Sequence, residues 1–295
     1  GAYATLAAMS NPATADPVLG LESWISTHVG SDTPIADDAA HVLRLPVLAV
    51  TKKIEGQIGE KLESDWQGVY REFAQNLAGR YPIAAGAGQA VARSDFEAFF
   101  GPDGTFQSFY KQSLAGIMAE DGSPRDPSAP VNPALLTAVQ KAWRIRRAFF
   151  QEGGRLGFRM TLRTEPPERP EGVNFLSSVL SIGGSSLQFR SVQPRPEEMS
   201  WPGERPDDGA SLTFDLRGSA DAQLLAHEGI WGFFRLLDRA SVSSGGGGAV
   251  RIRWTVPTTK GDMQVTYTAI GLPAVHPLER GILRFSLPER IGTGP

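Results

Sequence analysis

Residues 151–163 read QEGGRLGFRMTLR, and the hydrophobic period of the chain changes within them. Over residues 156–162 every second residue is apolar, which is the pattern of a β-strand with one buried and one solvated face. Upstream, apolar residues recur at intervals of three and four, which is the pattern of amphipathic helices. We therefore predict an α+β fold, with a helical domain over residues 1–152 and a β domain over residues 153–295.

The clearest helix of the first half is predicted over residues 63–79. Gly79 suits the position after the last turn, and Pro82 prevents continuation. Ala-rich helices are also predicted near residues 17–29 and 37–60. Burying one large apolar side chain contributes roughly 1.5–3 kcal/mol, so the apolar stripe dominates the stability of the helix over 63–79. The stripe consists of Trp66, Val69, Tyr70, Phe73 and Leu77.

Two further helices carry signals at their starts. Ser94, followed three residues later by Glu97, has the pattern of a capping box, in which each side chain satisfies a free backbone N–H. Asn132 followed by Pro133 predicts a helix that begins at the proline, with the asparagine as its N-cap. Both signals place helices upstream of the change in period.

The second half is predicted to be a mainly antiparallel, β-sandwich-like domain. Turn residues such as Gly183-Gly184 and 260–262 separate the alternating stretches. Residues 229–240 have helical spacing and predict one helix within this domain. Pro- and Gly-rich loops are predicted at 193–209 and 241–248. The predicted strands cover Leu156–Leu162, Leu212–Leu216, Val250–Val256, Met263–Tyr267 and Leu283–Leu287.

Composition excludes several classes of function. The chain has 295 residues, of which 41% are hydrophobic and 21% charged, as in ordinary globular proteins. A net charge of −3 argues against binding to nucleic acid. The absence of cysteine excludes disulfides, thiolate metal sites and a cysteine nucleophile. No run approaches the ~20 apolar residues of a membrane span, and the first residues lack an initiator Met, so we expect any membrane anchor to lie upstream of this chain.

Each pattern that could carry catalysis has a structural interpretation that we favour. Ser185-Ser186 follow a glycine turn rather than the G-x-S-x-G pattern, and the glycine run at 245–248 lacks the pattern of a phosphate-binding loop. His227-Glu228 resemble the start of H-E-x-x-H, but Trp231 occupies the place of the second histidine. The acidic pairs are interpreted as loop or helix-end carboxylates rather than a hydrolytic pair. These pairs are Asp37-Asp38, Asp207-Asp208, and Asp215 with Asp221.

We therefore predict no catalytic, cofactor-binding or metal-binding residue, and a protein that is not an enzyme. Trp201, which lies between proline-rich segments, either packs on its own sheet or anchors a partner, since Trp and Arg dominate the binding energy of many interfaces. On the second interpretation, the predicted partner-binding residues are Arg195, Trp201 and Arg205.

Several strings, in this order and spacing, resemble the C-terminal periplasmic region of the IcmF/TssM family over residues 60–290. The most specific are FFGPDG at residues 99–104 and GIWGFFRLLD at residues 229–238. The chain departs from the family at Gly232-Phe233 and in its glycine run. The other matching strings are Trp66–Tyr70, Phe73, Gly79-Arg80-Tyr81-Pro82, Asp95-Phe96, Phe106, Phe109, Ala142-Trp143, Ile145-Arg146, Ala148-Phe149-Phe150, Trp201-Pro202-Gly203 and Phe285-Ser286-Leu287-Pro288.

This resemblance implies a non-catalytic scaffold of the type VI secretion trans-envelope membrane complex, located in the periplasm and tethered to the inner membrane by transmembrane segments upstream of this chain. It implies as partners the outer-membrane lipoprotein TssJ, bound mainly by the β domain, the inner-membrane protein TssL, and further copies of the same protein. It implies no cofactor, nucleic acid or small-molecule substrate. The alternative function is a periplasmic module that binds or hydrolyses peptidoglycan. A solute-binding protein is disfavoured, because helices precede strands instead of alternating with them.

The same strings supply residues that we expect to stabilise the fold. Phe99 and Phe100 can wedge between helices, with residues 101–104 as the turn that follows. Arg235 and Asp238, three residues apart on one helix, can pair with each other or cap neighbouring backbone. The predicted structural set is Trp66, Tyr81, Phe99, Phe100, Trp231, Phe234, Arg235 and Asp238.

Overall fold

The computed structural model describes residues 53, 57, 59–125, 132–190, 196–216 and 223–291. These residues fall into two compact units, each assembled from segments that are distant in sequence. Unit 1 comprises the described parts of Gly1–Phe73, Thr105–Gln140 and Leu287–Pro295, and unit 2 those of Ala74–Gly104 and Lys141–Ser286. The helix predicted at 17–29 and most of that at 37–60 lie outside the described residues. The domain boundary at residue 152 stays a prediction.

Unit 1 is built on the predicted amphipathic helix, which covers residues 59–76. Trp66 is fully buried, and its ring lies 6.4 Å from that of Phe106 and 5.4 Å from that of Phe109, between centroids. Both phenylalanines belong to α5 (Thr105–Phe109), which continues into the π-helical turn η1 (Tyr110–Leu114). The Trp66 indole N–H donates to the carbonyl of Pro288 at 2.8 Å. The segment around Pro288, near the C-terminus, is therefore held against the helix over 59–76.

The helix α6 (Pro133–Phe149) begins as predicted. The Asn132 side-chain oxygen accepts a hydrogen bond from the Ala134 backbone N–H at 2.9 Å. Asparagine is thus the N-cap and proline the first helical residue, where its missing N–H is not needed.

The capping box predicted for the helix α4 (Arg93–Phe100) is wrong. The helix begins at Arg93, so Ser94 lies inside the first turn, and no side chain caps its N-terminus. Glu97 pairs with Arg93 one turn earlier, at 3.0 Å. A capping box requires the serine to be the N-cap, just before the helix, and here the helix begins two residues too early for that.

The turn predicted after α4 is confirmed at residues 101–104. The Gly101 N–H donates to the Glu97 carbonyl at 2.9 Å and closes the last turn of the helix. The rings of Phe99 and Phe100 are buried, and that of Phe285 lies 6.3 Å from the first and 5.1 Å from the second. Within unit 2 the rings of Phe99 and Phe100 therefore pack against the C-terminal segment that contains Phe285.

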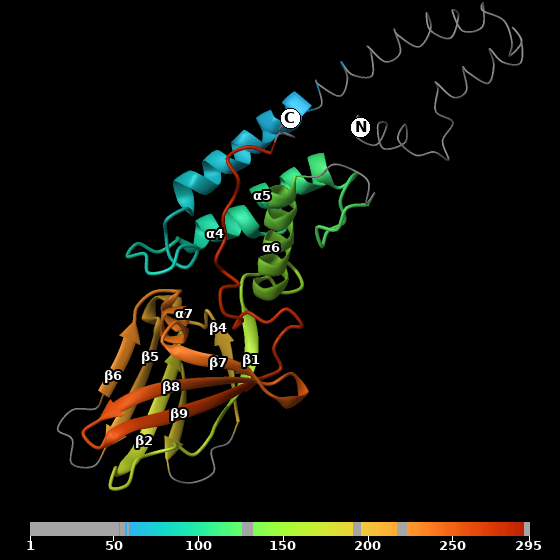
Figure 1. The fold of residues 1–295 in the computed structure, drawn as a ribbon. Coiled ribbons are helices and arrows are strands. Elements are labelled where there is room, and N and C mark those ends of the chain that lie inside the picture. The colour runs from blue at the N-terminus through green and yellow to red at the C-terminus, as the bar shows by residue number, and fades with distance from the viewer. Residues whose placement is uncertain are drawn as a thin grey trace, which may run out of the picture. The chain divides into compact units, whose positions relative to one another are not determined.

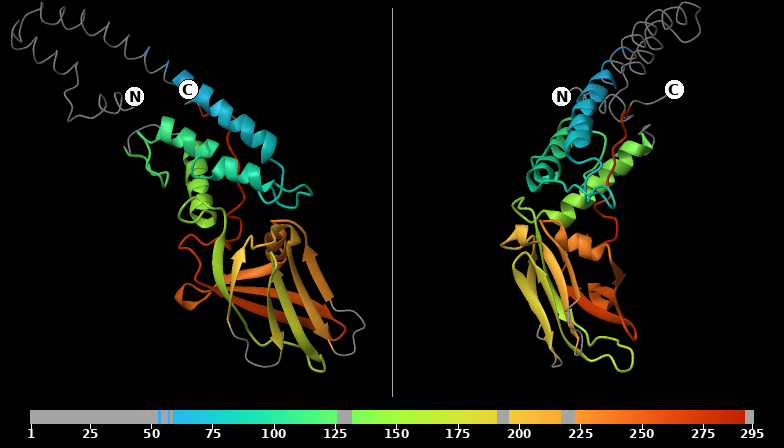
Figure 2. Two further views of the ribbon diagram at one scale, coloured as in Figure 1. Left: turned by 180° about the vertical axis from the view of Figure 1, so that it is seen from behind. Right: turned by 90° about the vertical axis from the view of Figure 1, so that its left-hand side faces the viewer.

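Unit 2 contains two antiparallel sheets that pack face to face (Figures 1 and 2). One has the strand order β4-β1-β9-β8-β7 and the other β3-β2-β5-β6. The Ser178 and Tyr267 hydroxyls, one from each sheet, hydrogen-bond at 3.1 Å inside the sandwich. The strands are β1 (Phe158–Thr164), β2 (Phe175–Ile182), β3 (Ser185–Arg190), β4 (Glu197–Trp201), β5 (Ala210–Leu216), β6 (Gln223–His227), β7 (Ala240–Ser244), β8 (Val250–Thr258) and β9 (Gly261–Ile270).

The α+β class and the glycine turn between β2 and β3 are confirmed, but three local predictions are wrong. The helix predicted at 229–240 is only α7 (Gly232–Leu237), because Ala240 already pairs with Trp254 as the start of β7. The loops predicted at 193–209 and 241–248 contain β4 and most of β7, whose pairing partners lie elsewhere in the chain. Residues 283–287 form no strand, although Leu283 and Phe285 are buried.

Replacing Gly104 tests the turn after α4. A Cβ there would lie 2.6 Å from the Ala98 carbonyl oxygen and 2.7 Å from that of Phe99, both in the helix backbone. We expect Gly104→Ala to lower the free energy of unfolding by about 1–3 kcal/mol. The control is Gly68→Ala, where a Cβ meets open space in the helix over 59–76 and should stabilise by about 0.5–1 kcal/mol. Urea unfolding measures both, and equal effects would contradict the prediction.

Tyr267 should make stability fall at alkaline pH. Burial raises the pKa of Tyr267 to about 12, against an opposing hydrogen bond from Ser178. The unfolded chain loses this proton near pH 10, so the contribution is complete below about pH 10 and is lost as pH rises towards about 12. Urea unfolding over that range should show a decline of up to about 1.4 kcal/mol per pH unit from this group, and Tyr267→Phe should be less steep. An unchanged slope in the variant would refute the assignment.

Candidate functional site

Three tryptophans anchor the segment around α7, which contains the most specific of the motifs. A helix this short is not stable alone, so its position depends on contacts with the rest of unit 2. Each indole N–H donates to a backbone carbonyl: Trp201 to Ile230 at 2.8 Å, Trp231 to Val91 at 2.7 Å, and Trp254 to Leu236 at 3.0 Å. The segment is therefore held both from the sheets and from the irregular chain that precedes α4.

The ring of Trp201 lies at the centre of an aromatic cluster. Trp201 and Trp231 are both 2% exposed. Aromatic pairs at such distances contribute about 0.5–1.5 kcal/mol each beyond the area they bury. The centroid of Trp201 lies 5.1 Å from that of Phe234, 5.3 Å from Trp231, 5.5 Å from Phe158 and 5.6 Å from Phe149.

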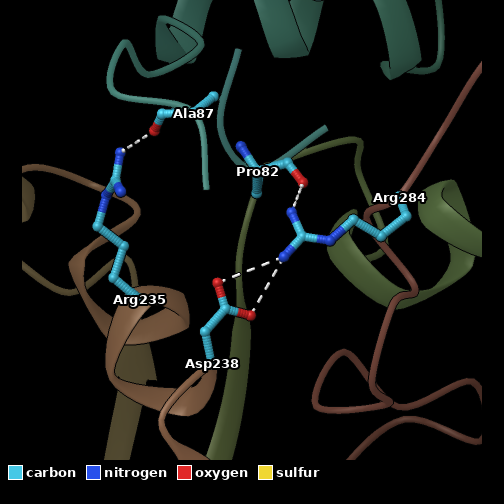
Figure 3. A network of polar contacts seen from close by, with 5 residues as sticks. All are labelled: Pro82, Ala87, Arg235, Asp238 and Arg284. Carbon is cyan, nitrogen blue, oxygen red and sulfur yellow. Dashed lines mark hydrogen bonds and ion pairs between the residues drawn. The ribbon is translucent and has the colours of Figure 1, made fainter. Parts of the chain in front are cut away.

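Beside this cluster, the predicted residues Tyr81, Arg235 and Asp238 meet Arg284 in one network, which we call the Tyr81 network. Figure 3 shows the polar contacts of its arginines and Asp238. The Arg235 guanidinium carbon lies 4.1 Å from the centre of the Tyr81 ring, and that of Arg284 lies 5.6 Å from it. Arg235 also donates to the Ala87 carbonyl at 3.1 Å. Burial, followed by the Asp238 carboxylate, raises the pKa of Tyr81, so its hydroxyl stays protonated.

Arg284 is the member of the Tyr81 network that the sequence analysis missed. Its guanidinium donates to both carboxylate oxygens of Asp238, at 3.2 and 3.3 Å, and to the Pro82 carbonyl (Figure 3). Of the two alternatives predicted for Arg235 and Asp238, pairing with each other is not found among the described residues. Arg235 instead donates to backbone carbonyls, and Asp238 pairs with Arg284. Arg284 lies 46 residues after Asp238, and no local pattern links two residues so far apart.

The cavity beside the Tyr81 network is too small for a substrate. Its volume is about 50 Å³, and Tyr81, Phe234, Leu237 and Arg284 are among its lining residues. Ligand pockets usually measure about 300–1,000 Å³, and a water takes up about 30 Å³. The cavity therefore has room for little more than water, and among the charged groups around it Asp238 and Arg284 pair with each other and Glu279 pairs with Arg144.

Of the three predicted partner-binding residues, the structure describes Trp201 and Arg205. Arg195 lies outside the described residues. Trp201 packs on its own sheet, which is the first of the two interpretations offered above, and its burial leaves little surface for a partner. The Arg205 side chain is 68% exposed and pairs with Asp208 at 3.1 Å. Partner binding by these residues stays a prediction.

Several of the residues weighed for catalysis lie at one end of the four-stranded sheet, where Ala210 pairs with both Ile182 and His227. Ser185-Ser186 begin β3, and His227 ends β6. Burial, with Arg239 and Arg235 nearby, lowers the pKa of His227. Asp208 is exposed in the turn η2 (Pro206–Asp208), while Asp37, Asp38 and Asp221 lie outside the described residues. Within the described ranges no group of three His, Asp or Glu residues could hold a metal ion.

Comparisons with known proteins define the class. Residues 170–269 match the type VI secretion protein IcmF C2-like domain. They include β2 to β8 in full and all but the last residue of β9. The chain is 30% identical over 253 residues to the type VI secretion system component TssM1 of Pseudomonas aeruginosa PAO1. That alignment covers 83% of this chain and 22% of the relative, so the chain spans about a fifth of the relative's length.

Solved structures show the same fold. A chain of a type VI secretion system membrane core complex superposes with a TM-score of 0.72 at 20% identity, over 85% of this chain and 52% of that one. The TssM C-terminal domain from EAEC superposes with a TM-score of 0.69 at 22% identity, over 80% of this chain and 99% of that one. Residues 170–269 thus match the IcmF C2-like domain, and the chain is similar in sequence to TssM1 and in fold to the TssM C-terminal domain.

A double-mutant cycle tests the Tyr81 network. We expect Asp238→Asn and Arg284→Gln to show a coupling of about 0.5–1 kcal/mol in the free energy of unfolding, since Arg284 donates to both carboxylate oxygens and also lies 5.6 Å from the Tyr81 ring. The control cycle uses Arg93 and Glu97, an exposed pair one turn apart on α4, for which about 0.3–0.5 kcal/mol is expected. A coupling at Asp238–Arg284 below that of the control would contradict the network.

Proposed function

We propose that this chain is a non-catalytic scaffold domain of the type VI secretion trans-envelope membrane complex. The observation that carries the proposal is the 30% identity to TssM1 along most of the chain, because that relative is a component of the secretion system. The Tyr81 network adds support, because its two arginines and its carboxylate bond to groups of this chain. The cavity beside them is small.

We place the domain in the periplasm, attached to the inner membrane by segments upstream of this chain. Among the described helices none is both long and apolar enough to cross a bilayer. In the assembled complex the protein would meet TssL at the inner membrane and further copies of itself. This chain spans about a fifth of its relative, so other parts of the protein would supply some of these contacts.

The β domain is proposed to bind the outer-membrane lipoprotein TssJ, with Arg205 at the contact. The loop that carries Arg205 is held against the β2–β3 turn, where its backbone N–H donates to the Gly183 carbonyl at 2.9 Å. Gly183 and Gly203 approach so closely, both with positive φ, that a Cβ on either would collide with the opposite backbone. A rigid loop loses little conformational entropy on binding, which favours it as a contact surface.

Calorimetry with purified, soluble TssJ from the same organism tests the proposal. We expect saturable binding, weakened about tenfold by Arg205→Ala if this arginine is a hot spot. The matched control is Arg159→Ala, because Arg159 is 71% exposed and its partner Glu198 is also exposed, as for Arg205 and Asp208. The control should bind like the parent chain.

The possible outcomes distinguish a failure of TssJ binding from a failure of the role proposed for Arg205. The absence of both heat and co-elution at tens of micromolar would overturn TssJ binding by this chain. Binding that Arg205→Ala leaves unchanged would retain the scaffold function and remove Arg205 from the contact. Release of soluble fragments from purified peptidoglycan would instead favour the hydrolytic alternative.

A further inference from the structure

A second cavity lies on the solvent-facing side of the five-stranded sheet, remote from the Tyr81 network in the fold. Its volume is about 320 Å³, which is in the range of small-ligand sites. It is formed where β1 ends, β8 begins and β9 ends, next to the glycine run that follows β7. Its lining includes Arg163, Arg251, Thr268, Glu165 and Gly246.

The strand register places two arginines on either side of one hydroxyl. Arg163 of β1 and Arg251 of β8 are both paired with Thr268 of β9, which lies between them. Residues directly opposite one another in an antiparallel ladder point to the same face of the sheet. The two guanidinium groups are thus presented on one face, separated by a single strand.

The charges of this cavity are only partly balanced. Glu165 accepts a hydrogen bond from the Thr268 hydroxyl at 2.7 Å and pairs with Arg251 at 3.3 Å. Elsewhere on this sheet Arg159 and Arg253 each pair with a glutamate, both at 3.6 Å. Arg163 pairs with no carboxylate in the described ranges. The cavity therefore carries two cationic groups and one anionic group, with the donors of Arg163 available.

One further feature favours close approach of a ligand. At Gly245 and Gly246 the rim has no side chains, so a ligand can approach the backbone closely.

We propose that this cavity binds a phosphate group, held by the Arg163 and Arg251 guanidiniums above Thr268. Guanidinium groups match phosphate oxygens with paired, charge-assisted hydrogen bonds, and two of them suit a group with more than one negative charge. The volume leaves room for the molecule that carries the phosphate. The ligand is either a free phosphate compound or an anionic lipid headgroup, and the site acts independently of partner binding.

The first arm of the test is a titration of the chain with inorganic phosphate, followed by NMR at constant ionic strength set with chloride, so that screening is the same throughout. Saturable shifts are expected at residues of β1, β8 and β9 around the cavity. Arg163→Gln and Arg251→Gln should each weaken binding about tenfold or more, since each removes a charged hydrogen-bonding group. The matched control is Arg253→Gln, on the same strand as Arg251, which should bind phosphate like the parent chain.

The second arm distinguishes an anionic lipid headgroup from a free phosphate compound. The chain is sedimented with vesicles of phosphatidylglycerol or of phosphatidylcholine alone. Binding to phosphatidylglycerol that Arg163→Gln abolishes and Arg253→Gln retains would assign the site to a lipid headgroup. Phosphate binding without vesicle binding would assign it to a free phosphate compound. The proposal is overturned if neither probe saturates, or if Arg253→Gln weakens binding as much as the two cavity variants do.

Discussion

The fold of unit 2 depends on burying the indole rings of Trp201 and Trp231 without leaving their N–H groups unpaired. Burial of the rings is strongly favourable, but a buried donor with no acceptor costs about 1–3 kcal/mol. The carbonyls of Ile230 and Val91 supply the acceptors. Both acceptors are on backbone that is not in a sheet, so satisfying the indoles also positions α7 and the chain before α4.

The Tyr81 network applies the same constraint to charge. Arg235, Asp238 and Arg284 surround a buried tyrosine, and each charged group has a carbonyl, a carboxylate or the aromatic ring as its partner. Groups satisfied in this way hold backbone segments together and are poorly suited to proton transfer or to binding a substrate. Under the scaffold proposal, this is what a domain requires when its task is to transmit force without changing shape.

The two proposals for unit 2 use surfaces of different kinds. The Arg205 loop is a protruding segment braced by close contact between backbones, as suits a protein contact. The cavity at Arg163 is a hollow on a sheet whose other exposed arginines are mostly neutralised by glutamates. The Arg205 loop connects β4 to β5, whereas the cavity at Arg163 lies on β1, β8 and β9. Binding at either surface can therefore be tested with variants that leave the other surface intact.

The sequence by itself determined what depends on near neighbours. These features are the helix predicted over 63–79 and found over 59–76, the Asn132 cap, the alternation of most strands and the glycine turn before β3. Period and turn chemistry act within a few residues. Only the tertiary structure decided that Trp201 is buried, that Asp238 pairs with Arg284, and that β4 and β7 are strands. Each of these depends on a partner distant in sequence. Residues 283–287 show the limit, since alternating burial without an adjacent strand gives an irregular segment and no ladder.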